Sequence, residues 1–307
     1  MHRSRRWLHP VVGVAVVAVL LWRFGPAPVA DALRRIDAWS LAAAAAIGLL
    51  TTVSTSWRWV LVARGLGLRL SLLDAFLASY RSQFLNVSLP AGIVGDVHRG
   101  VVHGRDTGQP ARAVRAVVLE RFAGQALQVC LAILSLLVVP SPVRGPALRV
   151  GIMLALAAAA LIVVALVIQR AGSLGRRLIR AAGAEVRGGI LHRRTWPGVI
   201  AASVVAIAGH VGTFLLAARQ AGPVASPWAL VPVAFIVLLA MGIPLNLAGW
   251  GPREGAAAWA FGAAGLSVSQ GLTTAVIYGG MVLVASLPGA AILTFTRRRR
   301  CPPEAGR

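Results

Sequence analysis

Two stretches of the sequence place acidic and basic side chains beside glycines and prolines within apolar surroundings: residues 86–100 and residues 244–255. Proline lacks an amide donor and glycine adopts backbone that helices do not, so each stretch should interrupt a helix. Within a membrane, irregular backbone persists only where protein or water satisfies its polar groups. We therefore expect both breaks to line a cavity. The residues expected to break the helices are Pro90, Gly92, Gly95, Pro244, Gly249, Gly251 and Pro252.

In the first break, Asp96 and Arg99 lie three residues apart and share a face if the helix resumes after Gly95. One interpretation is a simple ion pair at the membrane interface. The other is that Arg81 and Arg99 receive a phosphodiester headgroup, while Asp96 receives a counter-cation. The sequence leaves both open.

In the second break, a new helix is predicted to begin at Pro252, with Glu254 in the third position, where a carboxylate can cap free amides. A helix that starts at membrane depth turns its positive end inward. With Arg253 beside it, this end favours an anion such as a lipid phosphate. The alternative is that Glu254 only caps the helix and pairs with Arg253.

Glu120 and Arg121 form a third acid and base pair, near the start of an apolar run. The alternative is a purely topological role, because Arg121 can extend to the membrane surface.

No catalytic residue, metal or cofactor is expected. His98 and His103 lack a suitably placed third zinc ligand, and there is no phosphate-binding P-loop. The candidate headgroup-binding residues are Arg81, Asn86, Asp96, Arg99, Glu120, Arg121, Asn246, Arg253 and Glu254.

The composition identifies the class of protein. Of the 307 residues, 57% are hydrophobic and 13% charged, whereas soluble domains carry about 25% charged residues. An all-α integral membrane protein is therefore predicted. The net charge of +22 comes from arginines in short segments between apolar runs, a pattern that indicates membrane topology. Nucleic acid is not expected as a partner, because binding it needs a contiguous basic face.

Six apolar runs predict full transmembrane helices within a single polytopic domain; a cleaved signal peptide is the alternative for the first run. The runs are 8–24, 39–62, 116–139, 148–168, 196–218 and 272–296. His210, inside the fifth run, is expected only to hydrogen-bond to a neighbouring helix.

A basic loop at 170–195 and a basic tail at 297–307 are predicted to be cytoplasmic, and so is the N-terminus. Because both termini lie on one side, the number of crossings is even. The two broken segments must then be re-entrant hairpins, or each must cross twice. The first would enter from the cytoplasmic side and the second from the outer side. This geometry suggests an inverted repeat of two halves, about 1–140 and 148–300.

Four motifs, in this order, resemble one family. They are Ser88-Leu-Pro90-Ala-Gly92-Ile-Val-Gly95-Asp96-Val-His-Arg99, Leu119-Glu120-Arg121-Phe-Ala-Gly124, Ile243-Pro244-Leu-Asn246-Leu-Ala-Gly249-Trp-Gly251-Pro-Arg253-Glu254-Gly255 and Leu287-Pro288-Gly289. The family is the lysylphosphatidylglycerol synthase transmembrane-region family, the flippase-like membrane domain of the multiple-peptide-resistance proteins. The resemblance covers nearly the whole chain. One departure is Val94, which stands where the family pattern has glycine. The soluble aminoacyltransferase domain of the bifunctional members is absent, so lipid aminoacylation is not expected.

The resemblance implies translocation of an anionic phospholipid or a lipid-linked intermediate, such as a polyprenyl-phosphate species, across the cytoplasmic membrane. We therefore expect a non-enzymatic multi-pass protein with membrane lipids as partners; its oligomeric state stays open. One alternative is a membrane glycosyltransferase, or an accessory subunit, acting on a polyprenyl-phosphate-linked sugar with Asp96 or Glu254 as base. Another is a membrane scaffold whose loop at 170–195 docks a cytosolic partner.

Overall fold

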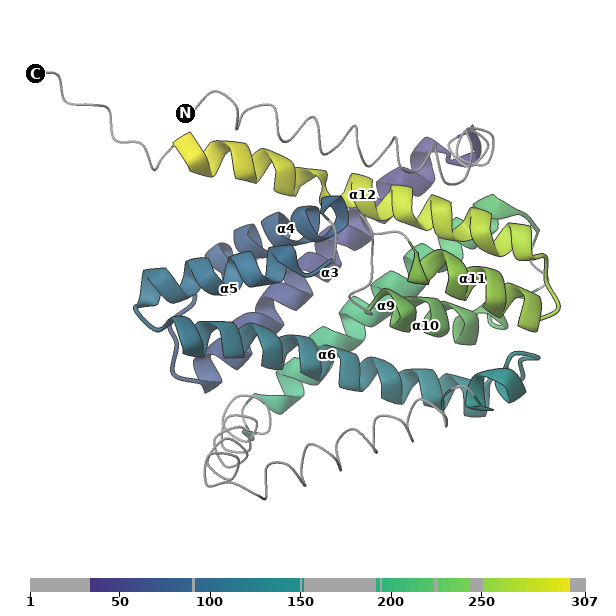
Figure 1. Ribbon diagram of the computed structural model, residues 1–307, viewed down its shortest axis with the longest axis horizontal. Coiled ribbons are helices and arrows are strands. Elements are labelled where there is room, and N and C mark those ends of the chain that lie inside the picture. Colours follow the sequence, from purple (N-terminus) through teal and green to yellow (C-terminus); the bar gives the residue numbers. More distant parts are fainter. Residues whose placement is uncertain are drawn as a thin grey trace, which may run out of the picture.

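The computed structural model describes residues 34–89, 92–149, 151, 192–193, 195–223, 226–242 and 251–298, and every regular element in them is a helix (Figure 1). Four of these helices are long and apolar enough to cross a membrane. They are α3 (Ala38–Gly65), α6 (Pro110–Val138), α9 (Trp196–Ala221) and α12 (Val268–Arg298). The prediction of an all-α membrane protein is confirmed.

These four helices correspond to four of the six predicted spans. The predicted spans at 8–24 and 148–168 lie wholly or mostly outside the described residues. The same is true of the predicted basic loop at 170–195 and of the tail at 297–307.

Each predicted break is a hairpin of two short helices. In the first, α4 (Leu72–Ser88) packs side by side with α5 (Val94–Thr107); in the second, α10 (Leu230–Met241) packs with α11 (Pro252–Ala263). The glycine that helps reverse the first hairpin, Gly92, has a φ of 62°. This is left-handed backbone that a side chain would disfavour.

The start of α6 corrects one detail of the prediction. The helix begins at Pro110, not at residue 116, because the hydrophilic segment before the apolar run is itself helical and is divided between α5 and α6 by a turn at Gly108. Glu120 therefore lies ten residues into the helix, about 15 Å from its start. The acid and base pair lies well inside the helix, and it remains near the start of the apolar run, as the sequence placed it.

The two halves of the chain repeat one order of elements: a long helix, a hairpin and a second long helix. The first long helices, α3 and α9, pack antiparallel, since Gly198 of α9 lies against Leu61 and Gly209 lies against Thr51. The two hairpins enter the bundle from opposite ends (Figure 1). The same order in opposite orientation is the arrangement of an inverted repeat.

Helix α12 runs alongside both hairpins. Near its start, Gly271 lies against Phe261 of α11; further along, Gly289 lies so close to α4 that an added Cβ would meet the backbone carbonyl of Tyr80. Small residues of this kind let membrane helices approach closely. Through these contacts, α12 holds the two hairpins in one bundle.

The opposed hairpins predict where two connecting loops lie. Gln109 joins α5 to α6 and Ser267 joins α11 to α12, and both are exposed. In a background in which Cys130 and Cys301 are replaced by serine, Gln109→Cys and Ser267→Cys should react with a membrane-impermeant maleimide from opposite sides of the membrane. Permeabilised membranes, in which both should react, provide the control. Labelling of both from one side would contradict the inverted arrangement.

Candidate functional site

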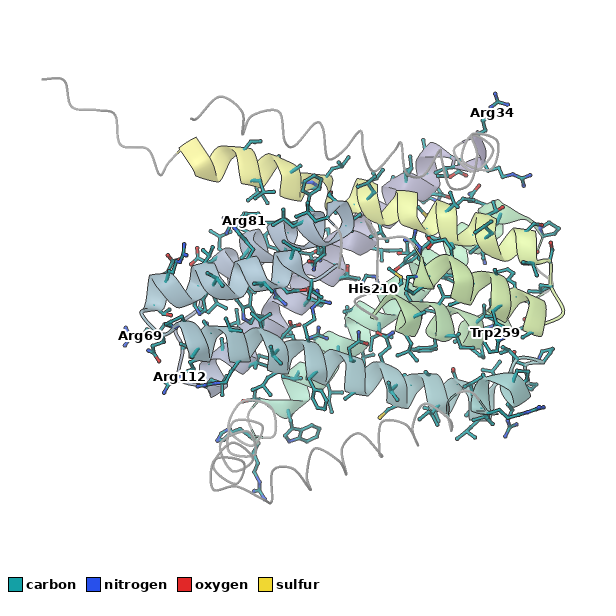
Figure 2. The ribbon with its side chains drawn as sticks, in the orientation of Figure 1. Arg34, Arg69, Arg81, Arg112, His210 and Trp259 are labelled. Carbon is teal, nitrogen blue, oxygen red and sulfur yellow. The ribbon has the colours of Figure 1, made fainter. Side chains whose placement is uncertain are left out.

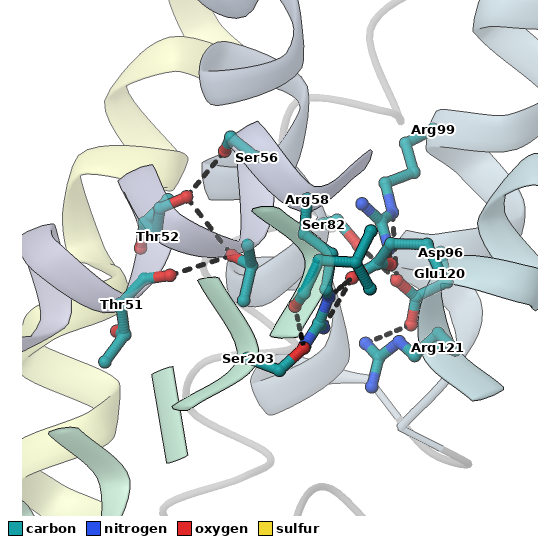
Figure 3. A network of polar contacts seen from close by, with 12 residues as sticks. Thr51, Thr52, Ser56, Arg58, Ser82, Asp96, Arg99, Glu120, Arg121 and Ser203 are labelled. Atoms are coloured by element: carbon teal, nitrogen blue, oxygen red, sulfur yellow. Dashed lines mark hydrogen bonds and ion pairs between the residues drawn. The ribbon is translucent and has the colours of Figure 1, made fainter. Parts of the chain in front are cut away.

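A network of buried charges joins α3, α5 and α6 (Figure 3). At its centre Glu120, 1% exposed, accepts a hydrogen bond at Oε1 from Arg58 Nε (2.8 Å). Its other oxygen, Oε2, accepts from Arg99 Nη2 (2.6 Å). One carboxylate therefore binds two guanidinium groups that come from different helices.

Asp96 is the second acid of the network. Its Oδ1 accepts from Arg99 Nε (3.1 Å) and from Ser82 Oγ (3.2 Å), and its Oδ2 accepts from Asn86 Nδ2 (2.8 Å) and from Arg121. As the third residue of α5, it also lies at the positive end of a helix. The predicted i, i+3 pair with Arg99 is present, and it is one part of a larger cluster.

The network holds three guanidinium groups against two carboxylates. The side chains of Arg58 and Arg99 are 9% and 5% exposed, whereas that of Arg121 is 49% exposed. The most exposed charged group of the network is thus the guanidinium of Arg121. The two buried guanidinium groups balance the two carboxylates, and the half-exposed Arg121 leaves the network as a whole with one positive charge in excess.

Three members of the network were missed as site residues from the sequence: Arg58, Ser82 and Ser203. Arg58 lies within the apolar run at 39–62, and Ser203 of α9 accepts a hydrogen bond from its Nη1 (2.9 Å). The signal for Arg58 was its position, since an arginine inside a membrane helix is costly unless it is paired. Nothing in the sequence marks Ser203, because small hydroxyl residues are common in membrane helices.

At the second break, Glu254 and Arg253 form the predicted cap and local pair. Glu254 Oε2 accepts from the Gly251 amide (2.6 Å), and Oε1 accepts from Arg253 Nε (2.8 Å). Helix α11 begins at Pro252, as the sequence predicted. The Arg253 guanidinium also lies 5.9 Å from the centre of the Tyr278 ring. Both charged side chains are buried, at 4% exposed.

The repeat extends to the two sites. Asp96 and Glu254 are each the third residue of the second helix of their hairpin. In each half, a glycine on the last long helix makes room for a guanidinium group, because a Cβ there would collide with it. The pairs are Gly124 with Arg58 and Gly279 with Arg253.

The structure also places the remaining predicted residues, apart from four outside the described part of the chain. The Nδ1 atom of His210, which is labelled in Figure 2, lies 3.3 Å from the Tyr278 hydroxyl, which confirms a bond to a neighbouring helix. Arg81 lines a pocket that Arg99 also lines. The Gly95 amide donates to Asn86 Oδ1 (2.7 Å), and a Cβ on Gly95 would collide with the backbone of α4. Predicted site or break residues outside the described residues are Pro90, Pro244, Asn246 and Gly249.

A model of the lysylphosphatidylglycerol synthase TM region matches residues 7–289. The chain belongs to this family. The match includes both hairpins and every charged residue of the two sites. A member of the lysylphosphatidylglycerol synthase TM region family has a membrane role related to lipids. No curated protein matches the sequence.

Removing the charge of Glu120 should destabilise the bundle. In Glu120→Gln, Arg58 and Arg99 stay buried and lose their shared carboxylate. Breaking a buried ion pair from one side costs about 3–5 kcal/mol. The free energy of unfolding, from thermal or denaturant unfolding in detergent, should fall by that amount. The control is Asp106→Asn, an exposed carboxylate on α5, which should change it by about 1 kcal/mol or less. Equal losses in the two variants would contradict a central role for Glu120.

Proposed function

We propose that this protein translocates an anionic phospholipid, or a lipid-linked phosphate intermediate, between the leaflets of the cytoplasmic membrane without catalysing a reaction. The observation that carries the proposal is the pair of hairpins that enter from opposite ends of the bundle (Figure 1). Each hairpin has a buried arginine and a buried acid at its break. Many transporters form their substrate path from discontinuous helices that meet from opposite sides of the membrane.

The charge balance favours an anionic cargo. Arg58, Arg99 and Arg121 face two carboxylates in the first half. In the second half, Arg253 lies at the positive end of α11. Guanidinium groups bind phosphate through paired hydrogen bonds. A phosphate group passing along the path would therefore meet a suitable partner at both breaks.

Helix α12 links the two hairpins. Its Gly279 lies against Arg253, and its Gly289 lies against α4 of the first hairpin. Ten residues of helix separate these contacts, which corresponds to about 15 Å. We expect a headgroup that moves along α12 from one hairpin to the other to cover about half of the hydrocarbon core, which is about 30 Å thick.

The orientation follows from the charges beside each hairpin. The segments that flank the first hairpin carry Arg64, Arg69, Arg105 and Arg112. Beside the second hairpin lie Arg219 and Arg35, which donates to the Ala221 carbonyl oxygen. Basic residues are retained in the cytoplasm. We place the open end of the first hairpin there.

Reconstitution into liposomes with fluorescent phosphatidylglycerol tests the proposal. Arg99→Lys and Arg253→Lys keep the positive charge and lose the planar fork of the guanidinium. Each should slow translocation about tenfold, since one charge-assisted hydrogen bond is lost. The control, Arg112→Lys, changes an exposed arginine bonded to Gln109 and should leave the rate unchanged.

Thermal unfolding of each variant separates loss of transport from loss of fold. Translocation no faster than in empty vesicles would refute the proposal. So would full rates in both the Arg99 and the Arg253 variant.

A further inference from the structure

A pocket of about 680 Å³ opens beside the buried network, between α4, α5 and the connection from α3 to α4. Its size lies within the range of about 300–1,000 Å³ that is usual for small-molecule sites. The pocket is distinct from the tip of the first hairpin, where Asn86 and Asp96 meet. Its charged and aromatic lining residues are Trp59, Arg69, Asp74, Arg81, His98, Arg99, His103 and Asp106.

Two residues that line this pocket each carry a buried nitrogen that has no hydrogen-bond partner. The nitrogens are Trp59 Nε1 and His103 Nε2, on side chains whose residues are 0% and 8% exposed. The rings pack against each other edge to face, with centroids 5.7 Å apart. Buried polar groups in proteins are nearly always paired. Two unpaired groups on residues that line one cavity therefore indicate a ligand that supplies the missing partner.

The chemistry of the wall defines the ligand. An indole nitrogen and a guanidinium group only donate hydrogen bonds, and His103 donates from Nε2 in one of its neutral tautomers. Arg99 lies with its guanidinium carbon 4.7 Å from the centre of the Trp59 ring, so the cation and the indole form one surface. Asp74 and Asp106 also line the pocket, against three arginines, so positive charge remains in excess. Donors beside this excess of cations fit an oxyanion that carries several acceptor oxygens.

We propose that this pocket binds a phosphate group through Trp59, His103 and the arginines beside them. The volume exceeds what a phosphate fills, so there is space for the attached part of a headgroup. The inference deepens the proposed function, on which it rests for the lipid form of the ligand. It identifies the site where the headgroup binds before it reaches the breaks.

Arg99 connects this pocket to the buried network. Its Nε and Nη2 bind Asp96 and Glu120, while its side chain also lines the pocket. A phosphate in the pocket therefore competes with these carboxylates for the same guanidinium. Release of Arg99 from Asp96 would loosen the contacts at the start of α5.

Binding to the full chain in phosphatidylcholine nanodiscs tests the pocket, with glycerol 3-phosphate and inorganic phosphate as calorimetric probes. Trp59→Phe keeps the aromatic ring under Arg99 and removes the donor; His103→Leu removes the second donor. Each should raise the Kd about tenfold, the effect of losing one hydrogen bond to a charged group. His103→Gln restores a donor and should recover affinity. The control is Trp57→Phe, the same substitution two residues earlier on α3. Trp57 does not line the pocket, so this variant should leave the Kd unchanged.

The source of the phosphate is resolved by adding phosphatidylglycerol to the nanodiscs. Displacement of glycerol 3-phosphate by this lipid identifies a headgroup site, and binding without displacement identifies a site for free phosphate; both outcomes support the pocket. Absence of binding by either probe, with no retention of phosphatidylglycerol in native mass spectra, would overturn it. So would affinities that the Trp59 and His103 variants leave unchanged. Normal pocket binding with no translocation would refute the proposed transport alone.

Discussion

The fold of the first half depends on the carboxylate of Glu120. Two arginines from different helices bind its two oxygens, and both side chains are buried. Burying such charges is costly, and only a complete set of partners offsets the cost. The helices that carry the partners are therefore fixed relative to one another. The positions of α3, α5 and α6 follow from this constraint, and the pocket and the first hairpin are built around it.

The sequence was sufficient to predict the class of protein, the two hairpins and the beginning of α11. These features depend on local signals. Apolar runs predict spans, and the order Gly251, Pro252, Glu254 predicts a capped helix start because each residue acts on its own backbone. The family resemblance was likewise visible in short motifs, and the match over residues 7–289 confirms it.

The contacts between distant residues were not predictable from the sequence. Arg58 and Glu120 are 62 residues apart, and nothing local pairs them. The start of α6 was misplaced because hydrophilic residues can continue a helix beyond the apolar run that marks its membrane part. The pocket was also missed, since Trp59 and His103, which are distant in the sequence, become neighbours only in the folded bundle. Sequence patterns identified which residues carry charge, and packing determined which charges meet.

The close approach at Gly95 has a mechanical consequence for the first hairpin. The α5 backbone lies directly on that of α4, and Asn86 and Ser82 bond across the same place. With no space between them, the two helices cannot slide past each other and must move as one rigid lever. Any bending has to occur outside the hairpin, where Gly67 and Gly108 have φ values of 76° and 68° in the turns at its two ends. Those turns are the natural hinges of the first half.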